Sequence, residues 1–462
     1  MSSAAILVET RSSRAGTLMV ALLGMLIAQI DTSVANLATP VIGRDLGAGV
    51  GQLQWVIDGF NLVYGGLLLT GGTLGDLYGR RRIFVIGIGL FCLGSIACAM
   101  APNAAWLIGG RMVAGVGAAL DVPLTLAFLS VAYPDPKERA HAVGLWAAAN
   151  GLAFVIGPTL GGFLVETLGW RSIFWLVVPL GALAWILAIR SIEESKGEQD
   201  RKLDLPGQVL LIGALGTFTL AAIEGHGWGW LSWPTLVCIG AAPVLLAGLI
   251  AVERGKETGL VPLRFFAIRK FSGGLVVTAA MTFGMYGMFF IAPIYLQNIR
   301  GASAFTAGLE MLPMPIAFFL LSQRSGHLAH KLGIRAMLII GMGCMGAGVI
   351  ALSFLQQATP LGWIEAAFVV AGIGLGFNTG PVLNMVVVAL PKDRAGTGSG
   401  LANTARLTGA TLGVAILGAI LASHQVAGVD AAQFMAGMSA ALKTGGVVLW
   451  LGGIAAAAIA RD

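Results

Sequence analysis

The chain has 462 residues, of which 57% are hydrophobic and only 11% carry a charged side chain. Soluble domains carry about 25% charged residues, so this composition excludes a soluble protein. The net charge of +6 does not indicate nucleic-acid binding, because the basic residues are spread over connecting loops.

Apolar runs long enough to cross a bilayer recur from one end of the chain to the other, and each predicts a membrane-spanning helix. The sequence therefore predicts an all-α membrane protein with fourteen transmembrane helices. Their expected positions are 16–39, 50–73, 82–101, 104–132, 141–166, 172–190, 206–226, 233–253, 272–297, 306–324, 335–355, 361–389, 397–422 and 444–460.

A short hydrophilic loop, Gly72–Arg82, separates the second span from the third. Gly79 suits the left-handed turn that ends a helix, and Asp76 lies where the positive N-terminus of the next helix can meet it. We expect this loop to be a conformational latch between helices, formed by Gly72, Asp76, Gly79, Arg80 and Arg81.

The pattern of this loop returns later in the chain at a constant offset, which indicates a duplication. The matched pairs are Gly72 with Gly326, Leu74 with Leu328, Gly79 with Gly333 and Arg81 with Arg335. Because His330 stands opposite Asp76, the second copy is expected to be the weaker latch. The duplication predicts two six-helix bundles, residues 1–190 and 272–462. Between them, residues 191–271 hold a charged linker and two inserted helices.

Lysine and arginine are distributed unequally over the two sides of the predicted topology. With the N-terminus placed inside, nearly all of them fall in inner loops. Only Arg44, Arg171, Arg300 and Lys443 fall in outer ones. This asymmetry is the one found in membrane proteins, whose cytoplasmic loops are rich in positive charge. It predicts an even number of spans with both termini in the cytoplasm.

Several motifs resemble those of the major facilitator superfamily, and within it the fourteen-span branch of drug:proton antiporters. Asp31–Pro40 looks like the first-span motif of that branch, and Gly72–Arg82 matches the loop motif of the family. Arg111 matches the fourth-span motif, although Ala114 replaces its usual glutamine. The fifth-span motif associated with antiporters is matched by Gly157, Pro158, Gly161 and Gly162.

The resemblance covers essentially the whole chain and implies two six-helix bundles plus two inserted helices. It implies a proton-coupled antiporter in a bacterial plasma membrane that exports amphipathic, cationic organic compounds by alternating access, as in multidrug efflux. The implied partners are small-molecule substrates, protons and the lipid bilayer, and the implied functional form is a monomer. No phosphate-binding Gly-x4-Gly-Lys-Ser/Thr loop is present, so the proton gradient is the expected energy source and no cofactor is expected. No grouping of residues indicates catalysis or a metal site.

Charges inside the predicted spans indicate where coupling takes place. Asp31, Asp58 and Arg111 are expected in one layer, about 10–12 Å below the outer surface. A charge at this depth is costly unless it has a partner or faces a watery cavity. We expect Arg111 to keep one carboxylate ionised while another exchanges its proton. Alternatively, Asp31 only links helices through backbone hydrogen bonds.

Besides Asp58, three further charges complete the candidate coupling and substrate site. Asp58 resembles the acid of branch members that export organic cations. Asp121 precedes a proline and is expected either to face a cavity or to satisfy backbone groups that the proline disturbs. In the second half, Glu310 is expected near the membrane interface. Arg406 is expected either to pair with Glu365 or to face the substrate.

In the fifth span, Gly157, Gly161 and Gly162 are expected on one face around Pro158, which predicts close packing and a kinked helix. Such a helix suits two bundles that rock against each other.

Three alternative functions remain open from the sequence. The first is an exporter of a neutral or anionic metabolite or antibiotic, which Arg111 and Arg406 permit. The second is a proton-coupled uptake symporter. The third is a membrane sensor or scaffold without flux.

Overall fold

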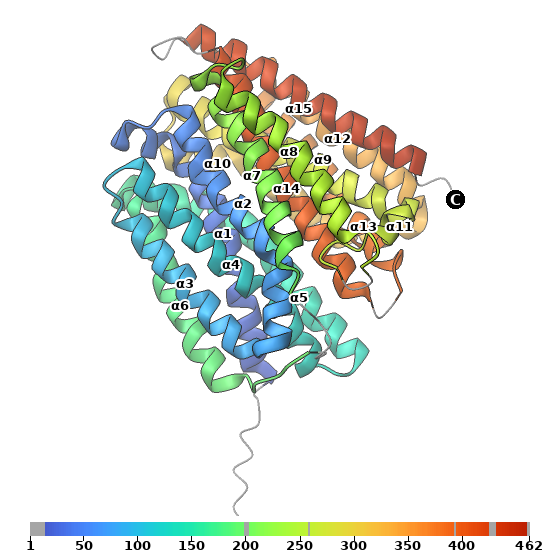
Figure 1. The fold of residues 1–462 in the computed structure, drawn as a ribbon. Helices are drawn as coiled ribbons and strands as arrows, with labels where there is room; N and C mark the ends of the chain where they lie inside the picture. The colour runs from blue at the N-terminus through green and yellow to red at the C-terminus, as the bar shows by residue number, and fades with distance from the viewer. Residues whose placement is uncertain (1–13, 198–202, 257–258, 392–393, 425–430, 460–462) are drawn as a thin grey trace, which may run out of the picture.

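The computed structural model describes residues 14–197, 203–256, 259–391, 394–424 and 431–459, and these form long helices packed side by side (Figure 1). Beside them stand a 3₁₀ turn, Leu263–Ala267, and a π-helical turn, Tyr295–Ile299. The helices are α1 Arg14–Leu46, α2 Val50–Tyr78, α3 Arg80–Ala99, α4 Ala104–Ala132, α5 Pro136–Leu168, α6 Arg171–Ser191, α7 Leu205–Trp228, α8 Trp233–Glu253, α9 Arg269–Ile294, α10 Ala304–Met311, α11 Pro313–Leu332, α12 Ile334–Leu352, α13 Leu361–Val388, α14 Ala395–Ser423 and α15 Ala431–Ile459.

In the described part of the chain, 13 helical segments are long and apolar enough to cross a membrane, with α10 and α11 counted as one. The remaining long helix, α2, is more polar, but its 29 residues rise about 43 Å, more than the roughly 30 Å of a hydrocarbon core. With α2 included the chain makes fourteen crossings, and the predicted fold class is confirmed. We call the side at which α1 begins the near side and the side at which it ends the far side.

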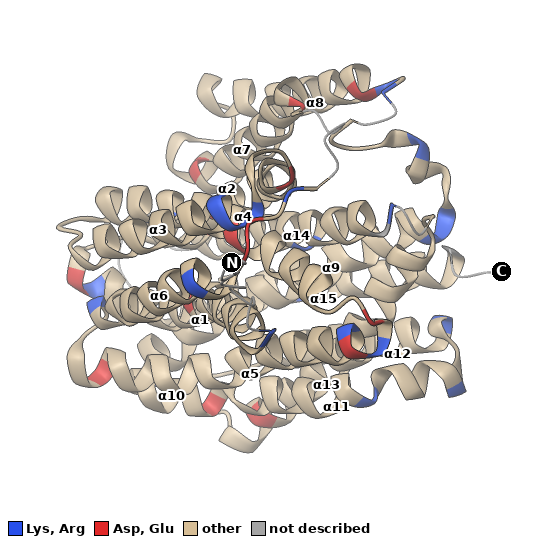
Figure 2. Ribbon diagram, turned by 90° about the horizontal axis from the view of Figure 1, so that it is seen from below, with Lys and Arg blue, Asp and Glu red and all other residues tan. Residues whose placement is uncertain are grey.

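Helices α1–α6 pack together as one bundle and α9–α15 as a second one. Charged residues gather at helix ends and connections and are scarce along the helices (Figure 2). One expected span is misplaced: α15 begins at Ala431, well before the expected position 444. Lys443 therefore lies within this helix and not in an outer loop, with its ammonium 5.4 Å from the centre of the Phe354 ring.

Small residues let the helices approach closely. A Cβ atom at Gly71 of α2 would collide with the backbone carbonyl of Ala119 in α4, and one at Gly117 of α4 would collide with the backbone of Phe91 in α3. Helices in lipid gain association energy from such close packing, because water does not drive them together.

The inserted helices α7 and α8 pack on each other, and α7 lies against both α2 and α14. It therefore touches both bundles. Gln208 of α7 donates a hydrogen bond to the Gly66 carbonyl of α2, and Trp55 of α2 donates one to Glu224 of α7, with 2.8 Å between nitrogen and oxygen. These hydrogen bonds, one near each end of α7, hold α7 alongside α2.

Asp204 caps α7 on the near side and joins it to the segment after α8. It accepts hydrogen bonds from the Gly207 amide and from Lys256, whose Nζ lies 2.8 Å from Oδ2. Burial acts to raise the pKa of Asp204, but hydrogen bonds from Glu253, Lys256, Gly207 and Leu260 outweigh it and hold the pKa below its ordinary value. The hydrogen bond to Asp204 in turn raises the pKa of Lys256.

The two copies of the duplicated loop share one turn geometry. Gly79 lies between α2 and α3 with a φ of 111°, and Gly333 lies between α11 and α12 with a φ of 81°. Each amide donates to the carbonyl four residues earlier, at 3.0 Å for Gly79 and 2.9 Å for Gly333. The left-handed turn that the sequence predicts at Gly79 is therefore present, and it recurs in the second bundle.

Alanine substitutions at two glycines, one in the turn before α12 and one within that helix, should have opposite effects on stability. In Gly333→Ala, positive φ imposes a strain of about 1–2 kcal/mol, since nothing else lies within 4 Å of the added Cβ. In Gly343→Ala, within α12, the same open surroundings should give a gain of about 0.5–1 kcal/mol. Thermal unfolding in detergent should show a lower melting temperature for the first and an equal or higher one for the second. Equal shifts of both would contradict the strain at Gly333.

Candidate functional site

Several hydrogen bonds join the two bundles on the far side. Gln54 of α2 donates to the carbonyls of Val414 and Ala415 in α14, both at 2.9 Å. Gln297 donates to the Leu37 carbonyl of α1 at 2.8 Å, and Arg44 donates to Asn298 at 2.7 Å. These contacts close the space between the bundles at that end.

Helix α5 adds a backbone contact to this closure. Glu166 accepts hydrogen bonds from the Ser303 hydroxyl at 2.6 Å and the Phe305 amide at 3.1 Å, at the start of α10. Gly162 is so close to α10 that a Cβ atom would lie 2.7 Å from the Ala304 carbonyl oxygen. A side chain at this position would push the bundles apart on the far side.

On the near side, α5 and α11 are largely uncovered. Between Pro136 and Ala148 of α5 only Ala142 is buried, whereas the far half of the helix is buried at eight positions from Gly151 to Val165. In α11, from Phe318 to its end, only Ser325 is buried. The bundles are thus held together at the far side and separate between α5 and α11 at the near side.

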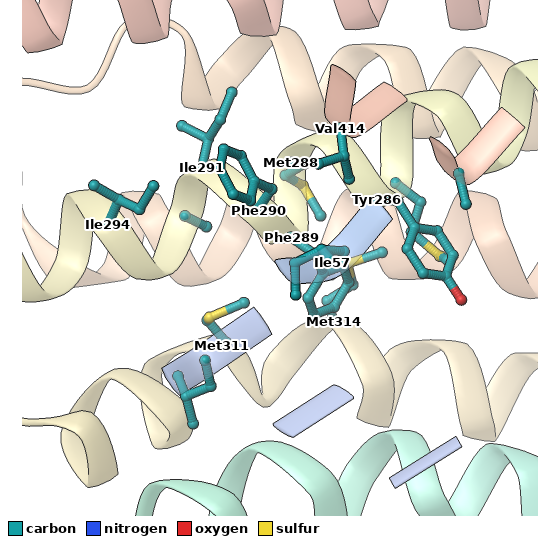
Figure 3. Close-up of a cluster of buried hydrophobic side chains, with 14 of the residues drawn as sticks. Ile57, Tyr286, Met288, Phe289, Phe290, Ile291, Ile294, Met311, Met314 and Val414 are labelled. Carbon is teal, nitrogen blue, oxygen red and sulfur yellow. The ribbon is translucent and has the colours of Figure 1, made fainter. Parts of the chain in front are cut away.

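A small hollow lies between the bundles just below the far-side closure. It is lined by polar side chains of α1 and by aromatic and methionine side chains of α5 and α9: Thr32, Ser33, Asn36, Phe154, Met285, Tyr286 and Phe289. We call it the central chamber. The apolar cluster around Phe289 closes its far end, and the Tyr286 hydroxyl points away from that cluster (Figure 3).

Asp31 and Arg111 form a buried ion pair beside the chamber. The pair joins α1 to α4, and the side chains are 2% and 1% exposed. The Arg111 guanidinium also donates to the Val56 carbonyl of α2 at 3.0 Å and lies 4.3 Å from the centre of the Phe60 ring. The structure thus brings together two of the three charges expected in one layer, as a buried ion pair.

Asp58, the third of these charges, lies elsewhere. It is fully buried, and neither carboxyl oxygen has a hydrogen-bond partner in the described chain. Its helix face is shared with Gln54 and Gly65, which both contact α14. At 3.6 residues per turn this face is about 120° around α2 from Tyr64. Asp58 therefore faces the seam between α2, α14 and α7.

Asp121 lies between α4 and α1. Its Oδ1 would be 2.5 Å from a Cβ atom added at Gly24, and the whole side chain is buried. Neither carboxyl oxygen has a hydrogen-bond partner in the described chain, so it does not satisfy the backbone near the following proline. It is close enough to Tyr64 to act on that hydroxyl electrostatically.

Arg406 lies in the middle of α14 and is partly buried. Its guanidinium donates to the Tyr286 hydroxyl at 3.4 Å and to Asn403 at 3.3 Å, and it is within hydrogen-bonding reach of Tyr64. Glu365, the expected pairing partner, is not in contact with it. The charges that act on Glu310 are Arg300 and Glu365, so Glu365 belongs to a far-side group.

Glu310 is half-buried in α10, one of its carboxyl oxygens lacks a hydrogen-bond partner within the described chain, and it is remote from the central chamber.

The latch residues contact the linker after α6 in this conformation. Arg80 pairs with Asp76 at 2.8 Å, and the Gly197 amide donates to the Asp76 carbonyl at 3.1 Å. Glu194 accepts hydrogen bonds from the amides of Arg81 and Arg82, at 3.0 and 3.1 Å, and so caps α3. Gly72 lies in the last turns of α2, and a Cβ atom added there would be 3.8 Å from the Cβ atom of Pro123.

The glycines of the fifth span face two directions. Cβ atoms at Gly157 and Gly161 would collide with Ser33 and Val34 of α1, while Gly162 abuts α10. Pro158 lies within α5, and its carbonyl is in close contact with Gly308 of α10. The motif therefore packs α5 against its own bundle and against the other one.

Two elements of the site are not identified from the sequence. Gln54 carries no charge and lies outside any motif, so nothing marks it as a contact between the bundles. Glu194 is one of many charges in a polar linker. The sequence does offer Tyr64, Phe154, Tyr286 and Phe289 as aromatic residues that either line a cavity or pack within the spans, and all but Tyr64 line the chamber.

Two helical bundles with a polar chamber between them, closed at one end, define a membrane transporter fold. Solved transporters have the same fold: a peptide transporter in complex with sulfate aligns with a TM-score of 0.71 at 15% identity over 96% of this chain and 94% of that one. A bacterial homologue of the human lysosomal transporter Spinster, in an inward-facing, unoccupied conformation, aligns with a TM-score of 0.67 at 18% identity over 96% of each chain.

The sequence profile of the Major Facilitator Superfamily matches residues 21–414, and the chain belongs to this family. It is a transporter and not an enzyme. It is 36% identical over 412 residues to the multidrug resistance protein Stp of Mycobacterium tuberculosis, covering 88% of this chain and 76% of that protein. It is 32% identical over 432 residues to a methylenomycin A resistance protein of Streptomyces coelicolor, covering 92% and 90%. The predicted family is confirmed.

A double-mutant cycle should show that Asp31 and Arg111 depend on each other. Removing one partner of a buried pair costs about 3–5 kcal/mol, because the other charge is left uncompensated. Asp31→Asn and Arg111→Gln should each lower the melting temperature strongly, and the double variant should be more stable than the sum of the two effects predicts.

The matched control is the exposed pair Arg171–Asp45, with side chains 41% and 48% exposed. Its coupling should be about 0–1 kcal/mol. Coupling at Asp31–Arg111 no larger than at this pair would contradict the role assigned to the buried pair.

Proposed function

We propose that the protein is a proton-coupled antiporter that exports amphipathic organic compounds by alternating access. The observation that carries the proposal is the central chamber between two bundles that are hydrogen-bonded to each other on the far side and separated between α5 and α11 on the near side. Its similarity to antibiotic and multidrug resistance proteins supports export of organic compounds. Alternating access then requires the far-side ties to break and the near side to close.

The orientation belongs to the proposal as well. The excess of lysine and arginine in the loops of the near side supports a cytoplasmic location for both termini. The structure then corresponds to an inward-open state in a bacterial plasma membrane. In this state Asp76 pairs with Arg80 and contacts the linker. We propose that the loop Gly72–Arg82 acts as a latch by engaging the second bundle when the near side closes.

Proton coupling rests on the contrast between paired and unpaired acids. Asp31 pairs with Arg111. Asp58 and Asp121 are buried without a hydrogen-bond partner in the described chain. An ionised carboxylate cannot be kept in such surroundings at acceptable cost, so these two groups carry protons in this conformation. We propose that they release them to the cytoplasm when the helices around them move.

The sequence favours cationic cargo because it places Asp58 near the substrate. That prediction has no support from the position of Asp58, which faces the seam of α2 with α14 and α7 and not the chamber. At this position Asp58 could exchange a proton when α2 moves against α14 and α7. The alternative, a neutral or anionic cargo, is therefore retained. The charged side chains next to the chamber distinguish it from a cationic cargo.

Replacing either unpaired acid by a residue that cannot bind a proton should uncouple transport from the proton gradient. In everted membrane vesicles with an imposed proton gradient, Asp58→Asn and Asp121→Asn should each reduce uphill uptake of a transported dye to about the level without a gradient. Downhill exchange of the dye should continue, because the chamber is intact. Proton release on addition of the dye, followed with a pH-sensitive probe, should be lost in parallel.

Asp45→Asn is the matched control, since Asp45 is an exposed acid at the end of α1 that pairs with Arg171. It should leave coupling unchanged. Uphill transport at the unaltered level in both Asp58→Asn and Asp121→Asn would refute the proton role of these acids.

A further inference from the structure

Arg406 is a charge at the depth of the central chamber that the proposed mechanism does not use. It lies on α14 at the depth of the central chamber and makes no ion pair with any residue that the structure describes. All the groups that contact its guanidinium are neutral: the hydroxyls of Tyr286 and Tyr64 and the amide oxygen of Asn403. Its positive charge is therefore not compensated within the described chain.

Arg111 shows that this chain can neutralise a buried guanidinium. Arg111 is 1% exposed and pairs with an aspartate. Arg406 is partly exposed and has no acid within ion-pair distance, although Asp121 is close enough to act on Tyr64. Asp121 instead lies against Gly24 of α1. A cation kept without a counter-charge in the membrane marks a place where a counter-charge arrives from outside.

The space next to Arg406 has the chemistry of a binding site for a planar compound. Tyr286 both lines the chamber and contacts Arg406. Phe154 lies between Phe289 and Phe318, with ring centres 5.4 and 6.3 Å away. Flat apolar groups bind favourably to such edge-packed rings.

The wall opposite the aromatic rings supplies hydrogen-bonding groups. Ser33 and Asn36 of α1 line the chamber, and their Oγ and Oδ1 atoms are buried without a hydrogen-bond partner in the described chain. Buried polar atoms are normally paired, so these two leave hydrogen-bonding capacity that a ligand could use once the chamber widens.

We propose that Arg406 binds the acidic group of the cargo, and that the transported compounds include planar amphipathic organic acids, whose carboxylate or phenolate contacts Arg406 while the ring system lies against Phe154 and Phe289. This inference rests on the proposed export function for its biological meaning, but it concerns binding and is testable without transport. Guanidinium groups bind carboxylates and phenolates through charge-assisted hydrogen bonds, which are the stronger ones.

The test compares two dyes that share one ring skeleton and differ in charge. Fluorescein methyl ester is a monoanion once its phenol is ionised, and rhodamine 123, also a methyl ester, is a monocation. Binding of each to the purified full-length protein in detergent is measured by fluorescence anisotropy at a pH that ionises the phenol. The wild-type protein should bind the anion about tenfold or more tightly than the cation, as expected for a charge-assisted contact.

Variants assign this preference to Arg406. Arg406→Gln should lose about tenfold in affinity for the anion and should not lose affinity for the cation. Arg406→Lys should retain part of the preference, which keeps the test valid if the glutamine variant is unstable. Arg269→Gln removes the same charge from an exposed position at the start of α9 and should change neither affinity.

Equal or tighter binding of rhodamine 123 by the wild-type protein would overturn the proposal. So would absence of binding of both dyes, or unchanged affinity for the anion in Arg406→Gln. Gradient-driven uptake of the same dyes into vesicles tests the export function separately. Selective binding without uptake supports the anion site and contradicts export, whereas uptake of the cation alone contradicts the anion site and supports export.

Discussion

The neutralisation of charge inside the membrane is the constraint on which this structure depends. A charge within a span has to find a partner, lose its charge or face a space that water or cargo can enter. Asp31 and Arg111 satisfy this constraint by pairing, with four helices contributing to their surroundings. Among the residues that the structure describes, Asp58 and Asp121 have no hydrogen-bond partner, and the partners of Arg406 are neutral. The three unpaired groups are thus the ones free to exchange charge during a transport cycle.

The inserted helix α7 explains how Asp58 can be buried although it does not face the chamber. Helix α7 lies against α2 and α14, the two helices that meet at the seam between the bundles. A lipid-facing seam would leave Asp58 close to the hydrocarbon, where an acid is costly. With α7 packed over it, Asp58 is enclosed by protein, and its surroundings change only when α2 and α14 move. The same contact that shields the acid connects it to the movement of the bundles.

Local features of this fold follow from the sequence, whereas contacts between helices do not. The length and apolar character of the spans predict the helices, and the need for positive φ predicts the turns at Gly79 and Gly333. Counting residues gives the depth of a side chain along its helix but not the direction in which it points. For this reason the sequence predicts only that Asp58 shares a layer with Arg111, and it leaves open whether Arg406 pairs with Glu365 or faces the substrate. The neighbours of Asp58 and Arg406 depend on how each helix is rotated against its neighbours, which the packing of many small residues determines.

The tyrosines around Arg406 connect charge recognition with movement. Tyr64 belongs to α2 in the first bundle and Tyr286 to α9 in the second, and both reach the same guanidinium on α14. When the bundles rock, the distance between the two hydroxyls changes, and Arg406 cannot keep both partners. An acidic group of the cargo that replaces one hydroxyl would stabilise one arrangement of the bundles over the other. A ligand shifts a conformational equilibrium only through such differential contacts. One contact between the cargo and Arg406 would therefore favour one arrangement of the bundles. This is possible because Arg406 is hydrogen-bonded to neutral hydroxyls from both bundles and not to an acidic residue of the described chain.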